Sequence, residues 1–304
     1  MSKIIVTGDT GLVGSNLVKE LEKQGHEVLG LSRQHGYDLR NKRKVDDVFN
    51  EFKPEVVYHL AAFAAEARGQ VSPVDMTQRN IGIFVNVLKS AVNVGVKKFL
   101  YTSSVAVYGE ATVPYKEDGP TIPKDVYGVN KLASEQILKI MAKVYGFEYV
   151  IFRPHNIYGP GQKMDDPYKN VVALFMRKLM EGEPYMLFGE GKMKRAFSYV
   201  DDVVEVMVNS LYSPNMTMNM GAENEISIKE LSDILQEVTG LTTEVQMKPA
   251  RPQEISMFLA DHTLQRKLFN YKETPLREGL IKTWNWVKKK ELPPVITIEK
   301  EINV

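Results

Sequence analysis

A tyrosine and a lysine stand four residues apart in the run Tyr127-Gly128-Val129-Asn130-Lys131, near the start of a predicted helix. Side chains with this spacing lie on the same face of a helix. An ammonium beside a phenol favours the phenolate and lowers the pKa of the phenol, so Tyr127 could exchange a proton with a substrate hydroxyl near neutral pH. Taken alone, this spacing is more often a surface pair, and the other motifs must decide between the two interpretations.

Hydroxyl side chains follow an apolar strand upstream of this pair. Ser103 and Ser104 come directly after the segment Lys98–Thr102. The carboxyl edge of a parallel sheet is where open α/β folds bind their ligands. Ser104 is therefore the candidate for a second hydrogen bond to the hydroxyl that reacts with Tyr127. A serine that only forms the turn is the alternative.

Glycines recur at every third position in segment 7–14 (TGDTGLVG), between the first strand and the first helix. Gly8 allows a tight turn, Gly11 lets a pyrophosphate approach the backbone, and Gly14 lets the helix pack closely on the strand. Free N–H groups at the helix N-terminus would bind the phosphates. A glycine-rich turn without a ligand is the alternative. The predicted dinucleotide contacts are Gly8, Thr10, Gly11, Leu12, Val13 and Gly14.

The second strand ends without the acidic residue that accepts a hydrogen bond from the ribose of NAD in dinucleotide-binding folds. Ser32 stands in that position and Arg33 follows it. A serine and an arginine can donate hydrogen bonds to the 2′-phosphate of NADP. The pair therefore favours NADP over NAD as the cofactor, and an arginine on a surface loop is the alternative.

The elements that must position these residues alternate between short apolar strands and amphipathic helices. This alternation predicts the α/β class: a doubly wound Rossmann parallel sheet covered on both faces, with a smaller α/β substrate-binding domain. In the first half we expect strands at 4–6, 27–31, 56–60, 98–102 and 148–152, and helices at 13–24, 45–52, 83–94 and 126–145.

The second half is less regular. We expect a loop over 156–166, helices over 171–181 and 223–238, and a segment 203–211 that packs on the main sheet. Ser227 and Glu230 have the spacing of a helix capping box.

The composition excludes several classes of protein. The 304 residues include 39 basic and 38 acidic side chains, a net charge of +1, without the basic excess expected of a general nucleic-acid-binding protein. The absence of cysteine excludes disulfides, thiolate nucleophiles and cysteine-based metal sites, and the five histidines show no paired helical spacing, so no metal site is expected. No segment approaches the roughly 20 apolar residues of a membrane span. We expect a cytoplasmic protein that binds neither nucleic acid nor membranes.

Three motifs follow one another along the chain: the glycine-rich turn, the serines after segment 98–102, and the pair of Tyr127 and Lys131. In this order they resemble the extended short-chain dehydrogenase/reductase family, particularly its nucleotide-sugar epimerases and reductases. The resemblance covers about residues 3–290 and implies an NAD(P)-dependent enzyme whose substrate is a nucleotide-sugar, with a UDP-sugar favoured. Tyr127, Lys131 and Ser104 match the catalytic residues, and Tyr127 and Lys131 would also contact the cofactor. The resemblance further implies a homodimer formed by the helices that begin near Asn80 and Tyr127.

Other segments carry the resemblance into both halves of the chain. Asp38-Leu39 is similar to the family's pair at the adenine, and Leu60-Ala61-Ala62 is similar to the loop beside the cofactor. Two arginines on separate segments could hold a diphosphate through charge-assisted hydrogen bonds. The resemblance implies four contacts to the diphosphate and ribose of the substrate: Asn156, Arg195, Arg251 and Glu254.

The predicted division of the chain follows from these assignments. We expect a dinucleotide-binding domain of residues 1–155 plus about 195–215. A nucleotide-sugar-binding domain would comprise about 156–194 and 216–290, and residues 291–304 would form a tail.

The residues after Ser104 bear on the reaction. The family's dehydratases carry Asp-Glu there and its decarboxylases a Glu, whereas this chain has Val105 and Ala106, which cannot move a proton. The aliphatic pair resembles the 4-epimerases and favours a nucleotide-sugar 4-epimerase. Ser32-Arg33 instead resembles NADPH-linked reductases, so a 4-ketoreductase or dehydrogenase of GDP- or dTDP-4-keto-6-deoxy sugars is the alternative. A third hypothesis, a non-catalytic NADP-binding regulator, is disfavoured because the tyrosine and lysine are both present.

Overall fold

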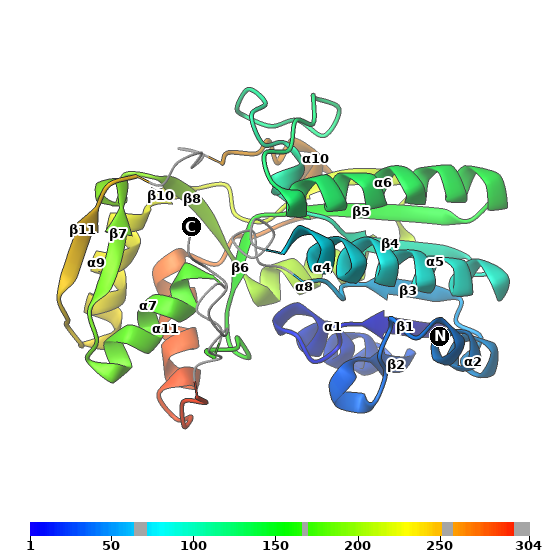
Figure 1. The fold of residues 1–304 in the computed structure, drawn as a ribbon, viewed down its shortest axis with the longest axis horizontal. Coiled ribbons are helices and arrows are strands. Elements are labelled where there is room, and N and C mark those ends of the chain that lie inside the picture. Colours follow the sequence, from blue (N-terminus) through cyan, green and yellow to red (C-terminus); the bar gives the residue numbers. More distant parts are fainter. Residues whose placement is uncertain (64–71, 166–169, 251–257, 295–304) are drawn as a thin grey trace.

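The computed structural model describes residues 1–63, 72–165, 170–250 and 258–294. Its main feature is a six-stranded parallel sheet in the order β2-β1-β3-β4-β5-β9 (Figure 1). The chain passes from β1 to β2 on one side and then to β3 on the other, so the strand order reverses at β1. The strands are β1 (Lys3–Thr7), β2 (Glu27–Leu31), β3 (Val56–His59), β4 (Lys98–Thr102), β5 (Glu148–Pro154) and β9 (Met216–Met220).

Helices cover both faces of this sheet (Figure 1). Successive side chains of a strand point to opposite faces. Ile4 and Val6 of β1 accordingly pack in one buried cluster with Leu17 of α1 and Val203 of α8, while Ile5 packs in a second cluster with residues of α2, α5 and α6. These helices are α1 (Leu12–Lys23), α2 (Lys42–Phe52), α4 (Pro73–Thr77), α5 (Ile83–Asn93), α6 (Val126–Tyr145) and α8 (Val200–Asn209).

This arrangement confirms the predicted Rossmann-type sheet and the packing of segment 203–211 on it. Each fully buried aliphatic side chain of the two clusters contributes roughly 1.5–3 kcal/mol. The predicted bounds of four elements, 27–31, 98–102, 126–145 and 171–181, agree with the structure.

Helix α6 begins and ends where its local sequence dictates. Asp125 is its N-cap, and the carboxylate accepts a hydrogen bond from the Gly128 backbone N–H at 2.7 Å. Gly146 ends the helix in the left-handed conformation with φ +74, which costs a glycine little. The first two turns of α6 therefore hold Tyr127 and Lys131 at the carboxyl edge of the sheet.

The second half of the chain builds a smaller α/β unit beside the sheet (Figure 1). It contains a three-stranded sheet in the order β10-β8-β6 and a two-stranded sheet of β11 and β7. Aromatic and aliphatic side chains of α7, α9 and α11 form its buried core. Its strands are β6 (Asn156–Tyr158), β7 (Tyr185–Phe188), β8 (Lys194–Tyr199), β10 (Glu225–Ser227) and β11 (Val245–Lys248), and its helices are α7 (Val171–Glu181), α9 (Ile228–Thr239) and α11 (Leu276–Val287).

Two predicted elements of this half are wrong in part. The start of the predicted loop over 156–166 forms β6, because Ile157 and Tyr158 pair with β8. The predicted helix over 223–238 begins only at Ile228, because Glu225–Ser227 pairs with β8 as strand β10. The capping box itself is confirmed, since the Ser227 hydroxyl accepts from the Glu230 N–H at 3.0 Å and the Glu230 carboxylate accepts from the Ser227 N–H at 2.7 Å.

One predicted boundary also differs from the sheet topology. The sequence places residues 216–220 in the nucleotide-sugar-binding part, whereas in the structure they form β9, which pairs with β5 in the main sheet. The short helix α10 (Thr263–Leu268) packs against β9. In the tail, the carbonyl of Pro293 accepts a hydrogen bond from Arg177 of α7 at 2.7 Å. Among the described residues, no helix has both the length and the apolar composition that a bilayer span requires.

Candidate functional site

The glycine-rich turn lies at the reversal point of the sheet, where β1 and β3 end side by side. Gly8 has φ +74, and a Cβ there would lie 2.9 Å from the Ala61 backbone nitrogen. A Cβ on Gly14 would lie 2.8 Å from the Asp9 Cα, so α1 could not approach the turn as closely with any other residue. Gly11 is the N-cap of α1 and supplies no side-chain cap. The turn thus presents uncapped N–H groups of Leu12, Val13 and the rest of the first helical turn at the carboxyl edge of the sheet.

The loop after β3 is held against this turn. The Thr7 hydroxyl accepts a hydrogen bond from the Ala61 N–H at 3.2 Å and lies 2.9 Å from Nδ1 of His59. Burial, together with the nearby charge of Lys131, lowers the pKa of His59 to about 3, so this imidazole stays neutral. Leu60 is half-buried and Ala62 is exposed on the same loop.

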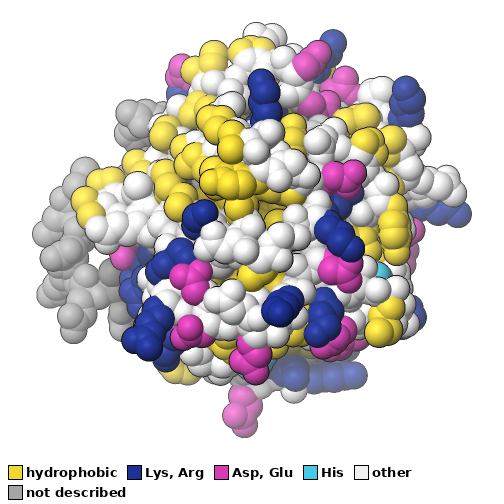
Figure 2. All heavy atoms as spheres, turned by 90° about the vertical axis from the view of Figure 1, so that its right-hand side faces the viewer, with side chains coloured by type: hydrophobic (Ala, Val, Ile, Leu, Met, Phe, Trp, Pro, Cys, Tyr) yellow, Lys and Arg dark blue, Asp and Glu magenta, His cyan; other side chains and the backbone are white. Residues whose placement is uncertain are grey.

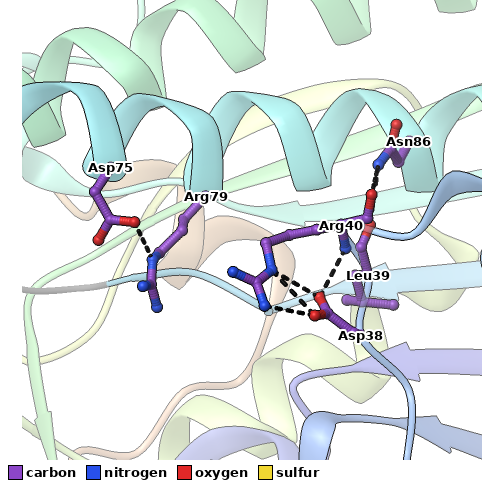
Figure 3. Close-up of polar contacts among 6 residues, drawn as sticks. All are labelled: Asp38, Leu39, Arg40, Asp75, Arg79 and Asn86. Carbon is purple, nitrogen blue, oxygen red and sulfur yellow. Dashed lines mark hydrogen bonds and ion pairs between the residues drawn. The ribbon is translucent and has the colours of Figure 1, made fainter.

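Asp38 and Leu39 lie beyond the end of β2 (Figure 3). The Arg40 guanidinium binds both carboxylate oxygens of Asp38, at 2.9 Å from Nε to Oδ1 and 2.6 Å from Nη2 to Oδ2. The hydrogen bonds from Arg40 lower the pKa of Asp38 to about 2 and keep it ionised. The carbonyl of Leu39 accepts from Asn86 of α5 at 3.0 Å, which ties this loop to the sheet's helical layer.

Ser32 and Arg33, which the sequence assigned to the cofactor, differ in exposure. Ser32 is buried, and its hydroxyl has no hydrogen-bond partner among the described residues. Arg33 is exposed at the start of a short 3-10 turn. The glycine-rich turn also carries Asp9, whose carboxylate lies 2.7 Å from Nδ1 of His35.

Lys131 contacts the end of β4, and Tyr127 lies beside it on α6. The Lys131 ammonium donates to the carbonyl of Thr102 at 2.6 Å and lies 5.6 Å from the centre of the Tyr127 ring and 4.9 Å from that of Tyr101. Burial lowers the pKa of Lys131 to about 7, although the charge of Glu135 opposes the shift. In the cofactor-free protein, burial therefore removes part of the charge of Lys131 near neutral pH, whereas the predicted chemistry needs the ammonium form beside the phenol.

The segment after Ser104 packs closely on the first turn of α6. A Cβ on Gly128 would lie 2.6 Å from the Ala106 carbonyl oxygen, so glycine allows the contact. Tyr127, which is 8% exposed, packs in a buried cluster with Ala106 and Met76. The Ser104 hydroxyl accepts from the Ala106 N–H at 3.1 Å, which orients the serine at the edge of the sheet.

A buried ion pair beneath these residues was missed by the sequence analysis. Arg153 of β5 donates to both oxygens of Glu135 of α6, at 3.0 Å from Nε and 2.7 Å from Nη2. The Ser103 hydroxyl donates to the same carboxylate at 2.5 Å, and Arg153 also donates to the Tyr108 hydroxyl at 2.8 Å. Burial lowers the pKa of Arg153, but the hydrogen bonds and charge of Glu135 outweigh it and raise that pKa above its ordinary value. The sequence does carry a signal for this ion pair. Glu135 follows Lys131 by four residues and therefore lies on the same, buried face of α6, where a carboxylate needs a partner.

The residues predicted to bind the substrate are brought together in part. The register of β6 with β8 pairs Asn156 with Phe197, two residues beyond Arg195. Asn156 is exposed and its side-chain amide donates to the Ala196 carbonyl at 3.4 Å. The Arg195 guanidinium lies 4.7 Å from the centre of the Phe258 ring. Arg251 and Glu254 lie outside the described residues.

Two features of the structure indicate that these residues can hold a dinucleotide. The glycines leave no room for side chains between α1, β1 and the loop after β3, and the turn at the end of β1 has uncapped N–H groups. A bound dinucleotide would lie against the carboxyl ends of the strands, next to Tyr127 and Lys131. Among the described residues, no group of three or more His, Cys, Asp or Glu could hold a metal ion.

The sequence profile of the NAD dependent epimerase/dehydratase family matches residues 4–221, more than half of the chain. The chain belongs to this family. It is 31% identical over 314 residues to the UDP-glucose 4-epimerase of Mycolicibacterium smegmatis, covering 95% of this chain and 99% of that protein. It is also 29% identical over 304 residues to GDP-L-fucose synthase 1 of Arabidopsis thaliana, covering 95% and 94%.

Solved structures of family members share the whole fold. The UDP-glucose 4-epimerase of Thermotoga maritima, solved with UDP-glucose, has a TM-score of 0.89 at 29% identity, with 94% of this chain and 99% of that chain covered. The UDP-glucose 4-epimerase of Thermus thermophilus, in complex with NAD, has a TM-score of 0.87 at 30% identity and the same coverage. The family and its fold therefore agree with the resemblance found in the sequence.

Proposed function

We propose that this family member is a nucleotide-sugar 4-epimerase that interconverts UDP-glucose- and UDP-galactose-type sugars. The observation that carries the proposal is the Lys131 ammonium 5.6 Å from the centre of the Tyr127 ring, which packs against Ala106, in a chain whose two residues after Ser104 are aliphatic. The pair can move one proton at one oxygen, and the positions after Ser104 offer no second acid or base for elimination. The similarity to UDP-glucose 4-epimerases over nearly the whole chain supports the same reaction.

Each residue has a defined task in this proposal. Tyr127, as the phenolate, takes the proton of the sugar 4-hydroxyl, and Ser104 holds the same oxygen by a hydrogen bond. Lys131 stabilises the phenolate and binds the cofactor ribose. A bound nicotinamide cofactor would supply reversible hydride transfer at C4, so that the sugar could be reduced again on its other face, and the glycine-rich turn and Lys131 would hold this cofactor. The substrate diphosphate stays anchored meanwhile by Asn156, Arg195 and Arg251, with Glu254 on the ribose.

The cofactor contacts of the proposal follow the three loops at the edge of the sheet. The glycine-rich turn binds the pyrophosphate, the loop after β2 binds the adenosine, and the loop after β3 lies beside the cofactor. The proposed contacts are Gly8, Thr10, Gly11, Leu12, Val13, Gly14, Ser32, Arg33, Asp38, Leu39, Leu60, Ala61, Ala62, Tyr127 and Lys131.

The decisive experiment incubates the protein with UDP-, GDP- and dTDP-sugars and follows the sugar protons by NMR. We expect UDP-glucose and UDP-galactose to interconvert without added reductant, and the C4 proton to be retained in heavy water, because the hydride returns from the cofactor. Tyr127→Phe should lower the rate by about 10²- to 10⁴-fold while dinucleotide binding persists. Tyr145→Phe, at the exposed far end of α6, is the matched control and should keep full activity. An active Tyr127→Phe enzyme would remove Tyr127 from its role.

A 4-ketoreductase is the second candidate. Ser32-Arg33 and the similarity to GDP-L-fucose synthase 1 favour it. The same three residues would serve, with Tyr127 as the acid that protonates the new hydroxyl. NADPH consumption on a 4-keto-6-deoxy sugar, with no interconversion of UDP-sugars, would establish this reaction and exclude the first.

We also propose that the chain forms a homodimer through α5 and α6. Val129, Ile140 and Val144 of α6 are 50–68% exposed, and their spacings of eleven and four residues put them on one face of the helix. Val85 of α5 is 40% exposed. Figure 2 shows hydrophobic side chains gathered in the upper half of the face where α5 and α6 end. Large apolar side chains exposed along one helix face are a candidate contact surface for a second copy of the chain.

A further inference from the structure

A carboxylate from the glycine-rich turn reaches the end of β2, where the sequence has no acid. Asp9 is 7% exposed, and its side chain occupies the space beside Gly30. A Cβ on Gly30 would lie 2.6 Å from the Asp9 Cγ, so only glycine at position 30 leaves room for this carboxylate. Gly30 is two residues before Ser32 in an extended segment, and the two positions therefore share a face of the strand.

The hydrogen bonds of this carboxylate are incomplete. One oxygen, Oδ2, lies 2.7 Å from Nδ1 of His35. The other, Oδ1, is buried and has no partner among the described residues, and the buried hydroxyl of Ser32 has none either. A buried carboxylate oxygen without a donor costs free energy, so the site favours a ligand that brings a hydroxyl donor.

The end of β2 is where dinucleotide-binding folds accept a hydrogen bond from the adenosine ribose. Resting on the proposed function, we propose that Asp9 supplies the acid missing from β2. Its Oδ1 accepts a hydrogen bond from a ribose hydroxyl of the cofactor, and its charge repels a 2′-phosphate. The chain is then selective for NAD. Arg33 does not cancel this effect, because it is exposed and its charge also acts on Asp38.

This inference reverses the preference for NADP that Ser32 and Arg33 predict alone. A 2′-phosphate beside Asp9 would place two anions at one buried position, which is unfavourable unless a cation separates them. The imidazole of His35 is already engaged through its Nδ1 by the Asp9 carboxylate.

Direct binding tests the proposal without turnover. We would titrate the cofactor-free protein with NADH and NADPH and follow the fluorescence of the nicotinamide. Wild type should bind NADH at least about 10-fold more tightly than NADPH. Asp9→Asn should weaken NADH binding by about 10- to 100-fold, the range for losing a hydrogen bond to a charged group, and should reduce the preference for NADH. Asp47→Asn removes the same charge from an exposed position on α2 and should change neither affinity.

A second variant tests the proposal independently if Asp9→Asn does not fold. Gly30→Ala keeps the charge but displaces the carboxylate, and it should also lower the ratio of NADH to NADPH affinity. The proposal would be overturned by a ratio of NADH to NADPH affinity that is unchanged in both variants, or by a wild type that prefers NADPH. Either result would still agree with a dinucleotide-dependent enzyme, and so with the proposed function. A wild type that binds neither nucleotide would instead overturn the proposed function, and this inference with it.

Discussion

Replacing Glu135 by glutamine should destabilise the protein far more than a surface substitution of the same kind. Glu135 is 0% and Arg153 is 3% exposed, and the carboxylate accepts three hydrogen bonds, two from Arg153 and one from Ser103. Glutamine has nearly the same shape, but it leaves the guanidinium charge buried without a counter-charge. Breaking a buried pair in this way costs about 3–5 kcal/mol, which is a large share of a typical stability of about 5–15 kcal/mol.

Urea unfolding followed by far-ultraviolet circular dichroism measures this loss. At a slope of about 3 kcal/mol per molar urea, a loss of that size lowers the midpoint by about 1 M or more. The control is Glu237→Gln, which breaks the exposed pair of Glu237 with Arg277 and should cost about 1 kcal/mol or less. The double variant Glu135→Leu with Arg153→Met should lose less than the sum of the single variants, because no buried charge remains unpaired. Equal midpoints for Glu135→Gln and the surface control would refute the reasoning.

Two further predictions follow from the same helix. Burial lowers the pKa of Lys131 to about 7, whereas an unfolded lysine keeps its proton to a pH of about 10.4. The unfolded state therefore binds more protons over this window, so the free energy of unfolding of the cofactor-free protein should rise between pH 7 and 10. The rise should be smaller in Lys131→Met. Parallel pH profiles of unfolding free energy in wild type and variant would contradict the lowered pKa of Lys131. Light scattering of the wild type should give the mass of two chains. Ile140→Lys places a charge on the apolar face of α6 and should give the mass of one chain. A wild-type mass of one chain would contradict the proposed dimer.

The elements of the main sheet could be predicted because their signals are local. Helix α6 has an aspartate cap at Asp125 and a glycine stop at Gly146, and both fall at the predicted ends. The strand Lys98–Thr102 contains the apolar run Phe99-Leu100-Tyr101, which can be recognised without knowledge of the neighbouring strands. The glycine spacing of the turn predicts close packing, and the structure shows a Cβ at Gly14 colliding with the backbone of Asp9.

The missed elements depend on partners far away in the chain. Strands β6 and β10 have three residues each, too few to show a period, and both exist because β8 pairs with them. The capping box at Ser227 marks the true start of α9, and residues 223–226 before it contain one apolar side chain, Ile226. Likewise, the sequence shows Arg153 and Glu135 only as charges on two buried elements, and their pairing requires the fold.

The choice between epimerisation and reduction depends on the residues that hold the cofactor, because the proton-transfer residues serve both reactions. An epimerase returns its hydride to the substrate and leaves the cofactor unchanged after each cycle, whereas a reductase must exchange its spent cofactor for a reduced one. A carboxylate at the adenosine ribose selects against NADPH, the expected reductant of the alternative reaction. On the role proposed for Asp9, the space that Gly30 leaves for its carboxylate therefore bears on the choice of reaction, whereas Tyr127 would serve both reactions. If Asp9→Asn reduces the preference for NADH while Tyr127→Phe loses interconversion of UDP-sugars, the first result supports an NAD-selective cofactor site and the second supports epimerisation, from independent parts of the site.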